Sequence, residues 1–235
     1  MDCKDRTNLG EQTDAEAVTR IVTVTGLDLA DIGCGPALAS RDLVQLGARV
    51  IGIEPDRVQA EKNRHAEPMA GLTFREGGAE KLALTDHSID GVLFFRSLHH
   101  VPIAQMDAAL EEAARVLKPD CGFLCVVEPG MTGSHFAVMR PFHDETLVRN
   151  EARAALARIS GRLFRHEANY RYVQYPRHAS FEAMVARVTG QTFNNIARDT
   201  VETDEVRALF EAGRSDQDDY VFEQPMLLDF YRSHA

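Results

Sequence analysis

Short apolar runs of strand length alternate with helical patterns over the first 130 residues of the chain. The runs are GLDLADIG at 26–33, RVIGIE at 49–54, LTFRE at 72–76, DGVLFF at 90–95 and CGFLCVVE at 121–128. Each run is short and continuous, which is typical of strands buried on both faces of a parallel sheet. The pattern therefore predicts five strands, each followed by a connection that crosses the sheet.

Helical patterns occupy most of these connections. Thr13 and Glu16 form a capping box, so a first helix is expected to begin at Thr13. Pro36 suits the first turn of a second helix, and Asp56 caps a third. Apolar residues recur at helical spacing over 103–117, which predicts a fourth. Because such crossovers are right-handed, the helices should cover both faces of a doubly wound, mostly parallel α/β sheet.

The pattern changes beyond Gly130 and becomes more helical and aromatic. We expect a helix from His143 to Ile159, further helices near 180–189 and 203–213, and a last strand in YVFEQPMLLDFYRS at 220–233. The aromatic segment YRYVQYP lies at 170–176. Its alternating tyrosines, Tyr170 and Tyr172, are more typical of one packed strand face than of a wall around a substrate. The whole chain reads as one domain.

The charge balance argues against polyanionic partners. Lysine and arginine number 26 and aspartate and glutamate 36, which gives a formal net charge of -10. Proteins that follow a phosphate backbone usually carry a basic patch, and the sequence has no such cluster. Apolar residues at 44% and charged residues at 26% are ordinary for a protein with a large core. No nucleic-acid partner is expected.

The first residues, MDCKDRTNLGEQTDAEA, are polar and acidic, unlike a secretion signal with its apolar core. The longest apolar run in the sequence is far too short to span a bilayer. We therefore expect a cytoplasmic protein without membrane insertion.

The four cysteines are Cys3, Cys34, Cys121 and Cys125. They are too few and too irregularly spaced for a disulfide scaffold. Cys121 and Cys125 share a face of one predicted strand, but four residues in a strand separate two side chains too far for one metal ion. We expect reduced, mostly buried thiols and no metal site.

A glycine-rich turn follows the first predicted strand, where open α/β sheets bind their ligands. Gly33 and Gly35 in the sequence DIGCGPA allow a sharp turn and a close approach of backbone to ligand. The second strand ends in Glu54, at the place where a carboxylate can accept both hydroxyls of a ribose. Either feature alone also occurs for purely structural reasons. Together, in this order, they favour a nucleoside ligand.

The turn departs from the dinucleotide fingerprint G-x-G-x-x-G/A. Leu38 stands at the third glycine position, where the fingerprint packs helix closely on strand. Asp31, just before the glycines, would place a negative charge beside a pyrophosphate, whereas it suits a cationic amino-acid group. The sequence also lacks a Y-x-x-x-K pair. An NAD(P)-dependent oxidoreductase is therefore the less favoured alternative.

Residues 27–130 resemble the class I S-adenosylmethionine-dependent methyltransferases, particularly their small-molecule branch called type 11. The family's first motif, D-x-G-x-G-x-G, corresponds to DIGCGPA, with Ala37 in place of the last glycine. The family's acid at the end of the second strand corresponds to Glu54, and its acid beside adenine to Glu80 in GGAEKLAL. FFRSLHHV and LKPDCGFLCVVEPG match the segments around the family's fourth and fifth strands.

The resemblance implies that S-adenosyl-L-methionine is the cofactor and S-adenosyl-L-homocysteine the product. Asp31, Gly33 and Gly35 would line the methionine end, and Glu54 would hold the ribose. Ala79 and Glu80 would flank the adenine. The complete set of implied cofactor-binding residues is Asp31, Gly33, Cys34, Gly35, Glu54, Pro55, Ala79, Glu80 and Arg96. Because this cofactor carries a sulfonium and an ammonium but no phosphate, acids around it are attractive.

The resemblance also implies a Rossmann-like sheet of seven strands with a helical insertion after the fifth. Residues 13–130 would form the cofactor-binding core of the single domain 1–235. Residues 131–200 would form a substrate-side insertion or cap, and residues 201–235 a closing helix and the last strand.

Methyl transfer is an in-line displacement, so holding the acceptor and the methyl carbon in line supplies most of the acceleration. A general base would help a hydroxyl or acidic carbon acceptor, and histidine is the commonest choice. His99 follows the fourth predicted strand and His143 lies in RPFHDET, so both are candidates. Each could instead be a structural residue at a turn or helix start. The acceptor is expected to be a small molecule.

A catalytically silent protein that binds S-adenosylmethionine is a further alternative, because this reaction requires no indispensable catalytic side chain. The protein is expected to be a monomer or a homodimer.

Overall fold

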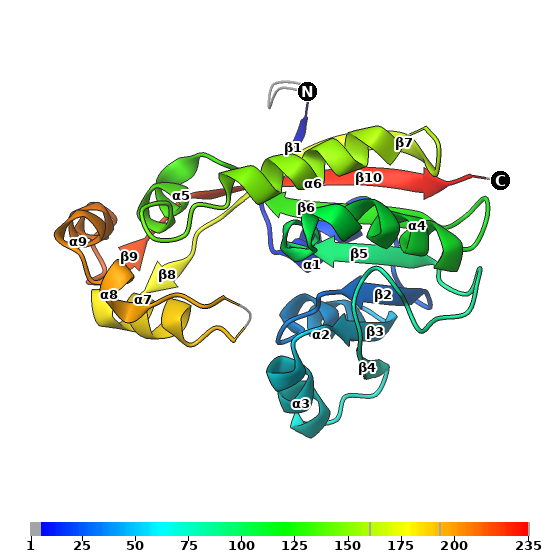
Figure 1. The fold of residues 1–235 in the computed structure, drawn as a ribbon, viewed down its shortest axis with the longest axis horizontal. Helices are drawn as coiled ribbons and strands as arrows, with labels where there is room; N and C mark the ends of the chain where they lie inside the picture. Colours follow the sequence, from blue (N-terminus) through cyan, green and yellow to red (C-terminus); the bar gives the residue numbers. More distant parts are fainter. Residues whose placement is uncertain (1–5, 160, 193, 235) are drawn as a thin grey trace.

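An eight-stranded mixed sheet runs through the centre of the computed structural model, which describes residues 6–159, 161–192 and 194–234 (Figure 1). The order across the sheet is β1-β7-β10-β6-β5-β2-β3-β4. The strands are β1 (Thr7–Glu11), β2 (Asp28–Ile32), β3 (Arg49–Glu54), β4 (Leu72–Glu76), β5 (Gly91–Phe95), β6 (Phe123–Pro129), β7 (Phe164–Gln174) and β10 (Gln224–Ser233). The doubly wound α/β class predicted from the sequence is confirmed.

The five strands from β2 to β6 are parallel, as predicted, and β10 lies antiparallel between β6 and β7. The chain runs outward from β2 to β4 and then returns to place β5 on the other side of β2. The order therefore reverses between β2 and β5, and ligands of open α/β sheets bind beyond the carboxyl ends of the strands at such a point.

The sheet contains one strand more than the seven expected. The additional strand, β1, pairs with β7 at the edge of the sheet, and its five residues are half-buried or exposed. Its sequence, TNLGE, has a single large apolar residue, so neither an apolar run nor an alternating pattern marks it. Backbone pairing with β7 forms this strand, and the hydrophobic pattern of the sequence does not predict that pairing.

Helices cover both faces of the sheet (Figure 1). On one face, α4 (Met106–Val116) and α6 (Thr146–Ile159) pack against Val92, Leu124 and other strand residues. On the other face, α1 (Asp14–Thr19) and α2 (Leu38–Gln45) pack against residues including Leu93 and Cys125. Successive residues of β6 enter opposite cores, which explains why this strand is apolar throughout. The capping box of Thr13 and Glu16 begins α1, as predicted.

Further helices connect the elements of this core or follow them along the chain. They are α3 (Arg57–His65), the 3-10 helices η2 (Leu98–His100) and η3 (Ile103–Gln105), α5 (Gly133–Met139), α7 (Phe181–Thr189), α8 (Arg198–Val201) and α9 (Asp204–Glu211). Across the described ranges, no helix combines the length and the apolar character that crossing a membrane demands.

A separate lobe stands at one end of the sheet, on the left of Figure 1. It consists of α5, α7, α8, α9 and the short hairpin of β8 (Arg177–His178) and β9 (Tyr220–Val221), and we call it the cap lobe. A third hydrophobic cluster, in which Phe181, Phe210 and Phe222 are fully buried, holds it together.

The chain contributes to this lobe differently from our expectation. Residues 131–200 do not form one insertion, because α6 packs on the sheet and β7 is part of it. Tyr172 is buried and Tyr170 packs beside it in the core, so the alternating tyrosines do form one packed strand face. Conversely, α9 lies beyond residue 200 but belongs to the cap lobe. The expected last strand divides into β9, in this lobe, and β10, in the sheet.

Among the described cysteines, Cys34 and Cys125 are buried and Cys121 is exposed, and all three are free thiols. Burial raises the pKa of the Cys34 and Cys125 thiols, which keeps both protonated and unreactive at neutral pH. Cys3 lies outside the described residues.

Candidate functional site

The glycine turn lies at the carboxyl end of β2, directly before α2. Gly33 and Gly35 have φ angles of 69° and 51°, in the left-handed region that favours glycine. A Cβ on Gly33 would lie 2.7 Å from the Cβ of Ser97, which follows β5. Glycine is therefore needed at 33 both for the turn and for the close approach of the segment after β5. Ala37 also has a positive φ, of 57°, at the start of α2.

The backbone N–H groups of this turn are engaged inside the protein. Gly33 and Cys34 both donate to the Ile53 carbonyl, at 2.8 and 3.1 Å. Gly35 donates to Glu54 Oε2 at 2.7 Å, and Ala37 donates to the Cys34 carbonyl at 2.8 Å. Pro36 has no N–H to offer. A pyrophosphate site needs free backbone N–H groups at this place, and the turn from 33 to 37 has committed them.

Glu54, at the end of β3, is 5% exposed and lies against this turn. Its Oε2 accepts from Gly35, and its Oε1 accepts from the Asp56 N–H at 2.9 Å. Burial raises the pKa of this carboxyl above its usual value, and the two backbone donors oppose that shift. Each carboxylate oxygen can accept more than one hydrogen bond, so the fixed Glu54 carboxylate can still accept from hydroxyl groups of a ligand.

Asp31 is 1% exposed, near the end of β2. Ser40 of α2 donates to its Oδ2 at 2.5 Å, whereas its Oδ1 is buried and has no hydrogen-bond partner. Burial, aided by the nearby carboxylates of Asp14 and Glu54, raises the pKa of Asp31 to about 7 against the opposing hydrogen bond from Ser40. A buried polar atom without a partner costs about 1 to 3 kcal/mol, so Oδ1 is suited to a donor group from a ligand.

The remaining predicted cofactor residues lie near the turn but differ in what their side chains contact. The Cys34 sulfur points inward, 3.7 Å from the Asn63 amide nitrogen. Pro55 is exposed beside Glu54, Ala79 is 7% exposed, and Glu80 is exposed. The structure thus brings Pro55 to the turn through its neighbour Glu54 and leaves the Cys34 thiol facing the interior.

Arg96 extends toward α1 rather than toward the turn. One of its terminal nitrogens donates to Asp14 Oδ2 at 2.6 Å. Asp14 is 4% exposed and also accepts from the Tyr172 hydroxyl at 2.6 Å and the Gln174 amide at 2.7 Å. This buried carboxylate connects α1, β7 and the segment after β5. This ion pair engages one terminal nitrogen of Arg96 and holds the side chain toward α1.

Leu38 differs from its expected place. Its side chain is 69% exposed at the start of α2, so it does not crowd the packing of helix on strand. The departure from the dinucleotide fingerprint at this position therefore has no steric consequence. The engaged backbone N–H groups of the turn and the buried Asp31 carboxylate disfavour a dinucleotide instead.

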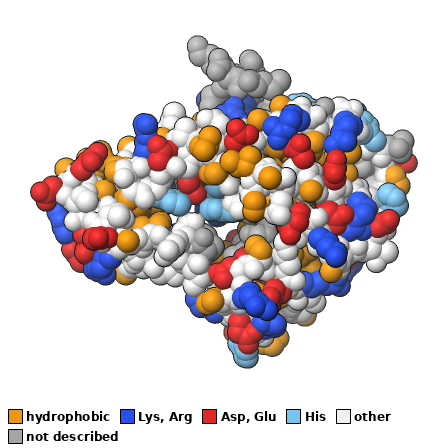
Figure 2. All heavy atoms as spheres, in the orientation of Figure 1, with side chains coloured by type: hydrophobic (Ala, Val, Ile, Leu, Met, Phe, Trp, Pro, Cys, Tyr) orange, Lys and Arg blue, Asp and Glu red, His pale blue; other side chains and the backbone are white. Residues whose placement is uncertain are grey.

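A cluster of histidines lies beyond the carboxyl end of β5, and histidine atoms are visible in the middle of the face shown in Figure 2. His99 and His143, 44 residues apart in the sequence, both contact Glu145 Oε1 through Nε2, at 3.4 and 2.8 Å. His99 also forms a close ion pair with Glu128 through Nδ1. The structure therefore brings the two candidate catalytic histidines to one carboxylate.

The charges within this cluster determine which of its histidines are protonated. Burial lowers the pKa of His99, but the carboxylates Glu128 and Glu145 outweigh it and raise the value to about 9. Burial and the charge of His99 lower the pKa of His100 to about 4. Burial alone would raise the pKa of Glu145, yet its contacts with His143 and His99 bring it well below its usual range. A protonated His99 cannot accept a further proton, so this arrangement does not support His99 as a separate general base.

Several residues of the site were not expected from the sequence. Glu128, Glu145, Asp14 and Ser40 all make buried contacts at this edge, but none belonged to the predicted set. Of these residues, only Glu128 had a sequence feature that could have identified it, because it stands at the end of a predicted strand, as Glu54 does. Carboxyl ends of parallel strands meet at one edge, so an acid there is a candidate by the same reasoning.

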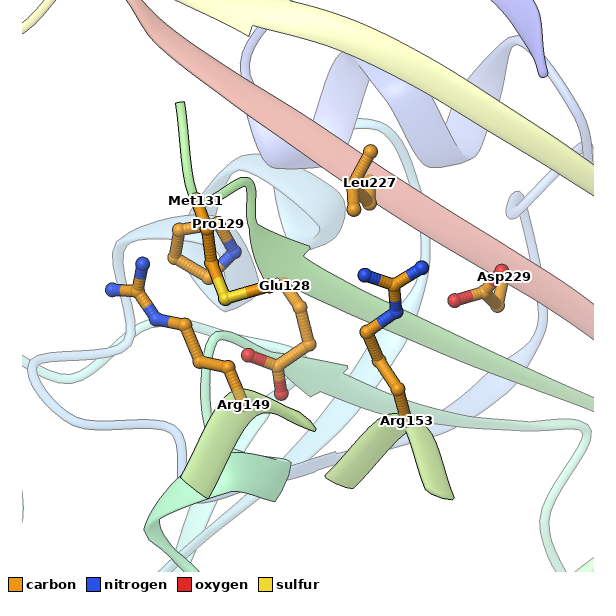
Figure 3. A pocket seen from close by; sticks show the side chains of 7 residues that line it. All are labelled: Glu128, Pro129, Met131, Arg149, Arg153, Leu227 and Asp229. Atoms are coloured by element: carbon orange, nitrogen blue, oxygen red, sulfur yellow. The ribbon is translucent and has the colours of Figure 1, made fainter. Parts of the chain in front are cut away.

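A small hollow borders the cluster between α6, β6 and β10 (Figure 3). Arg149 and Arg153 rise from α6 on either side of Glu128 in this view, and Asp229 of β10 lies beyond them. The Arg149 Nε is buried without a partner. Another hollow lies at the opposite edge of the sheet, where β2 and β3 begin beside Asp28 and Arg49, away from the glycine turn.

Comparison with known proteins places the glycine turn within a recognised domain. The family model described as "Methyltransferase domain" matches residues 30–125. The "Ubiquinone biosynthesis O-methyltransferase" of Cereibacter sphaeroides is 40% identical over 106 residues, which are 43% of this chain and 40% of that protein. The protein of the same name from Azorhizobium caulinodans is 30% identical over 115 residues, 48% of this chain and 44% of that one. The chain thus matches less than half the length of these relatives.

Solved structures share the fold over nearly the whole chain. A protein of Bacillus halodurans C-125, provisionally named a methyltransferase, has a TM-score of 0.62 at 16% identity and covers 95% of this chain and 100% of its own. The [4+2]-cyclase SpnF has a TM-score of 0.56 at 18% identity and covers 94% of this chain and 80% of its own. At these identities the similarity establishes the fold alone. The matched segment 30–125 contains the glycine turn, Glu54 and His99, and this segment is similar to the methyltransferase domain.

Proposed function

We propose that the chain binds S-adenosyl-L-methionine at the glycine turn and transfers its methyl group to a small-molecule acceptor. One observation carries the choice of cofactor. The N–H groups from Gly33 to Ala37 are engaged internally, and two buried carboxylates, Asp31 and Glu54, stand beside them. Such a turn repels a pyrophosphate and attracts a nucleoside with positive charge.

The residues present fit this cofactor. Glu54 is held by two backbone donors with acceptor capacity left over, which suits the two ribose hydroxyls. Asp31 Oδ1 has no partner, which suits an ammonium donor at the methionine end. When bound, S-adenosylmethionine supplies a methyl group on a positively charged sulfur. The chain's own contribution is to hold an acceptor in line with that methyl group.

The acceptor side is proposed to be the histidine cluster beyond β5. His143, whose side chain is partly exposed, would face the acceptor, and Glu145 would position it through the oxygen that also contacts His99. The relatives that match residues 30–125 are named O-methyltransferases, which favours an acceptor with a hydroxyl group.

A second candidate function is a protein that keeps the nucleoside site without methyl transfer. The similarity to the [4+2]-cyclase SpnF supports this second candidate function, because that protein shares the fold and is named for a reaction other than methyl transfer. The two candidates differ in turnover and agree in cofactor binding.

The direct test is release of S-adenosylhomocysteine from S-adenosylmethionine in the presence of a panel of small phenols and catechols. We expect turnover with at least one hydroxylated acceptor and a loss of about 10- to 150-fold in kcat/KM for Glu54→Gln, the range that follows from losing about 1.5 to 3 kcal/mol of charged hydrogen bonding. Glu61→Gln, which changes an exposed acid of α3, is the matched control. Cofactor binding without turnover on any acceptor would favour the second candidate.

A further inference from the structure

Three imidazole nitrogens converge on a single carboxylate oxygen at the edge of the sheet. The Nε2 atoms of His143, His99 and His100 lie 2.8, 3.4 and 3.9 Å from Glu145 Oε1. Ligand atoms of His99, His100 and Glu145 all lie within 4.8 Å of one another. Two distant parts of the chain, η2 and the segment before α6, thus bring four metal-ligating side chains together.

These distances match those between the ligands of one metal ion. In a tetrahedral zinc site with bonds of about 2.0 to 2.2 Å to nitrogen and oxygen, neighbouring ligand atoms lie about 3.3 to 3.6 Å apart. The observed separations from Glu145 Oε1 bracket this range, and the ligand atoms of His99, His100 and Glu145 lie within 4.8 Å of one another, so an ion would draw the imidazoles closer together. Imidazole and carboxylate are ligands that zinc and its neighbours among the transition metals accept.

The residues around the cluster hold these ligands in the orientation that a metal requires. Glu128 takes the Nδ1 side of His99, which leaves its Nε2 directed at the cluster. Arg149 takes Oε2 of Glu145 at 2.5 Å and leaves Oε1 facing the three imidazoles. A ligating histidine almost always donates its other ring N–H to a carboxylate, a backbone carbonyl or water, and this partner fixes the tautomer.

The cluster also has an access route. The His99 side chain is 2% exposed, whereas those of His100 and His143 are 37% and 23% exposed, so one side of the cluster faces solvent. Asn194, in the connection from α7 to α8, lies 3.4 Å from His143 Nε2. An ion here would connect η2, the segment before α6 and the connection that leads out of α7.

The geometry points to a binding site for one divalent transition-metal ion, formed by His99, His100, His143 and Glu145 and oriented by Glu128. This inference reverses the expectation from the sequence that the chain has no metal site. It goes beyond the proposed function, because the site forms whether or not a methyl group is transferred. It coincides with the histidine cluster proposed as that function's acceptor side, where an ion would present a Lewis acid to an oxygen-bearing acceptor.

The test is equilibrium dialysis of the EDTA-treated, full-length protein against Zn²⁺, with bound metal measured by mass spectrometry. We expect about one tightly bound ion per chain and a thermal unfolding midpoint that rises with zinc. His100→Ala and Glu145→Gln should bind zinc at least tenfold more weakly and lose the rise. Glu128→Gln, which leaves all four ligands in place, should weaken binding by about 10- to 100-fold.

The control is His65→Ala, which removes an exposed histidine of α3 and should bind zinc like the wild type. Circular dichroism of each variant distinguishes lost binding from lost folding, and His100→Ala is the mildest change because that side chain is partly exposed. Wild-type protein that binds no more zinc than Glu145→Gln would overturn the inference. Titration of the same zinc-free protein with S-adenosylhomocysteine separates the two proposals, because either ligand can bind without the other.

Discussion

Individual residues at the glycine turn have different reasons to be there. Gly33 is confined by the segment after β5, whereas a Cβ on Gly35 would meet nothing within 4 Å. Asp31 and Glu54 are both buried carboxylates, but Glu54 has a donor on each oxygen and Asp31 lacks one on Oδ1. These contrasts allow variants that separate backbone geometry from ligand binding.

Replacing Gly33 with alanine should destabilise the protein more than replacing Gly35. Both positions have a positive φ, which costs an alanine about 1 to 2 kcal/mol. Gly33→Ala additionally forces the backbone near Ser97 to move, because the new Cβ would lie 2.7 Å from the Ser97 Cβ. Urea unfolding of the two variants measures the difference. Equal losses would show that the approach of the segment after β5 is not tight.

Replacing Asp31 with asparagine should change how stability depends on pH. The folded carboxyl has a pKa of about 7, raised by burial, against about 3.9 in the unfolded chain. Between these values the folded state holds a proton that the unfolded state has released, so this residue lowers the free energy of unfolding as pH rises from about 4 to about 7.

Asp31→Asn should therefore gain stability relative to the wild type between pH 5 and pH 8, measured by urea unfolding at both values. Exposed Asp42, on α2, supplies the matched control Asp42→Asn, which should show no such gain. A constant difference between wild type and Asp31→Asn across this range would contradict the assignment of a raised pKa to Asp31.

At the scale of elements, buried polar contacts fix where α1 lies on the sheet. Asp14 receives three donors, from Tyr172 and Gln174 of β7 and from Arg96 after β5. The first two join α1 to an element more than 150 residues later in the chain. Arg96, which donates to this carboxylate, has a left-handed backbone conformation with a φ of 56°.

Asp14→Asn should cost about 1 to 3 kcal/mol of the free energy of unfolding, because an amide cannot accept all three hydrogen bonds and leaves buried donors unpaired. Tyr172→Phe removes a single one of these contacts and should cost about 1 kcal/mol. Chemical unfolding of both variants and of the double variant tests the connection. If the losses of the two single variants added up to the loss of the double variant, Asp14 and Tyr172 would not belong to one hydrogen-bond network, because residues within a network have non-additive effects on stability.

The elements predicted from the sequence were those with a strong local pattern. Strands β2 to β6 are apolar because both of their faces are buried, and this made them readable as short continuous runs. The edge strand β1 is exposed and has no such run. In β7 only Phe164 and Tyr172 are buried and no regular alternation runs along the strand, so its sequence pattern does not reveal its pairing. Long-range pairing decides both strands.

At the scale of the whole molecule, the two halves of the site could be predicted to different degrees. The turn and Glu54 could be predicted from the order of motifs over residues 31–54, because parallel strands bring their carboxyl ends together. The histidine cluster depends on α6 packing beside η2, which places Glu145 against His99. Nothing in the local sequence around 145 encodes that contact.

The glycine turn is expected to bind S-adenosylmethionine and not a dinucleotide. Calorimetric titration of the wild type and of Glu54→Ala with S-adenosylhomocysteine, with NAD as a parallel ligand, tests this directly. We expect micromolar binding of S-adenosylhomocysteine by the wild type, at least tenfold weaker binding by Glu54→Ala and no binding of NAD. Binding of NAD alone, or unchanged affinity in Glu54→Ala, would contradict it.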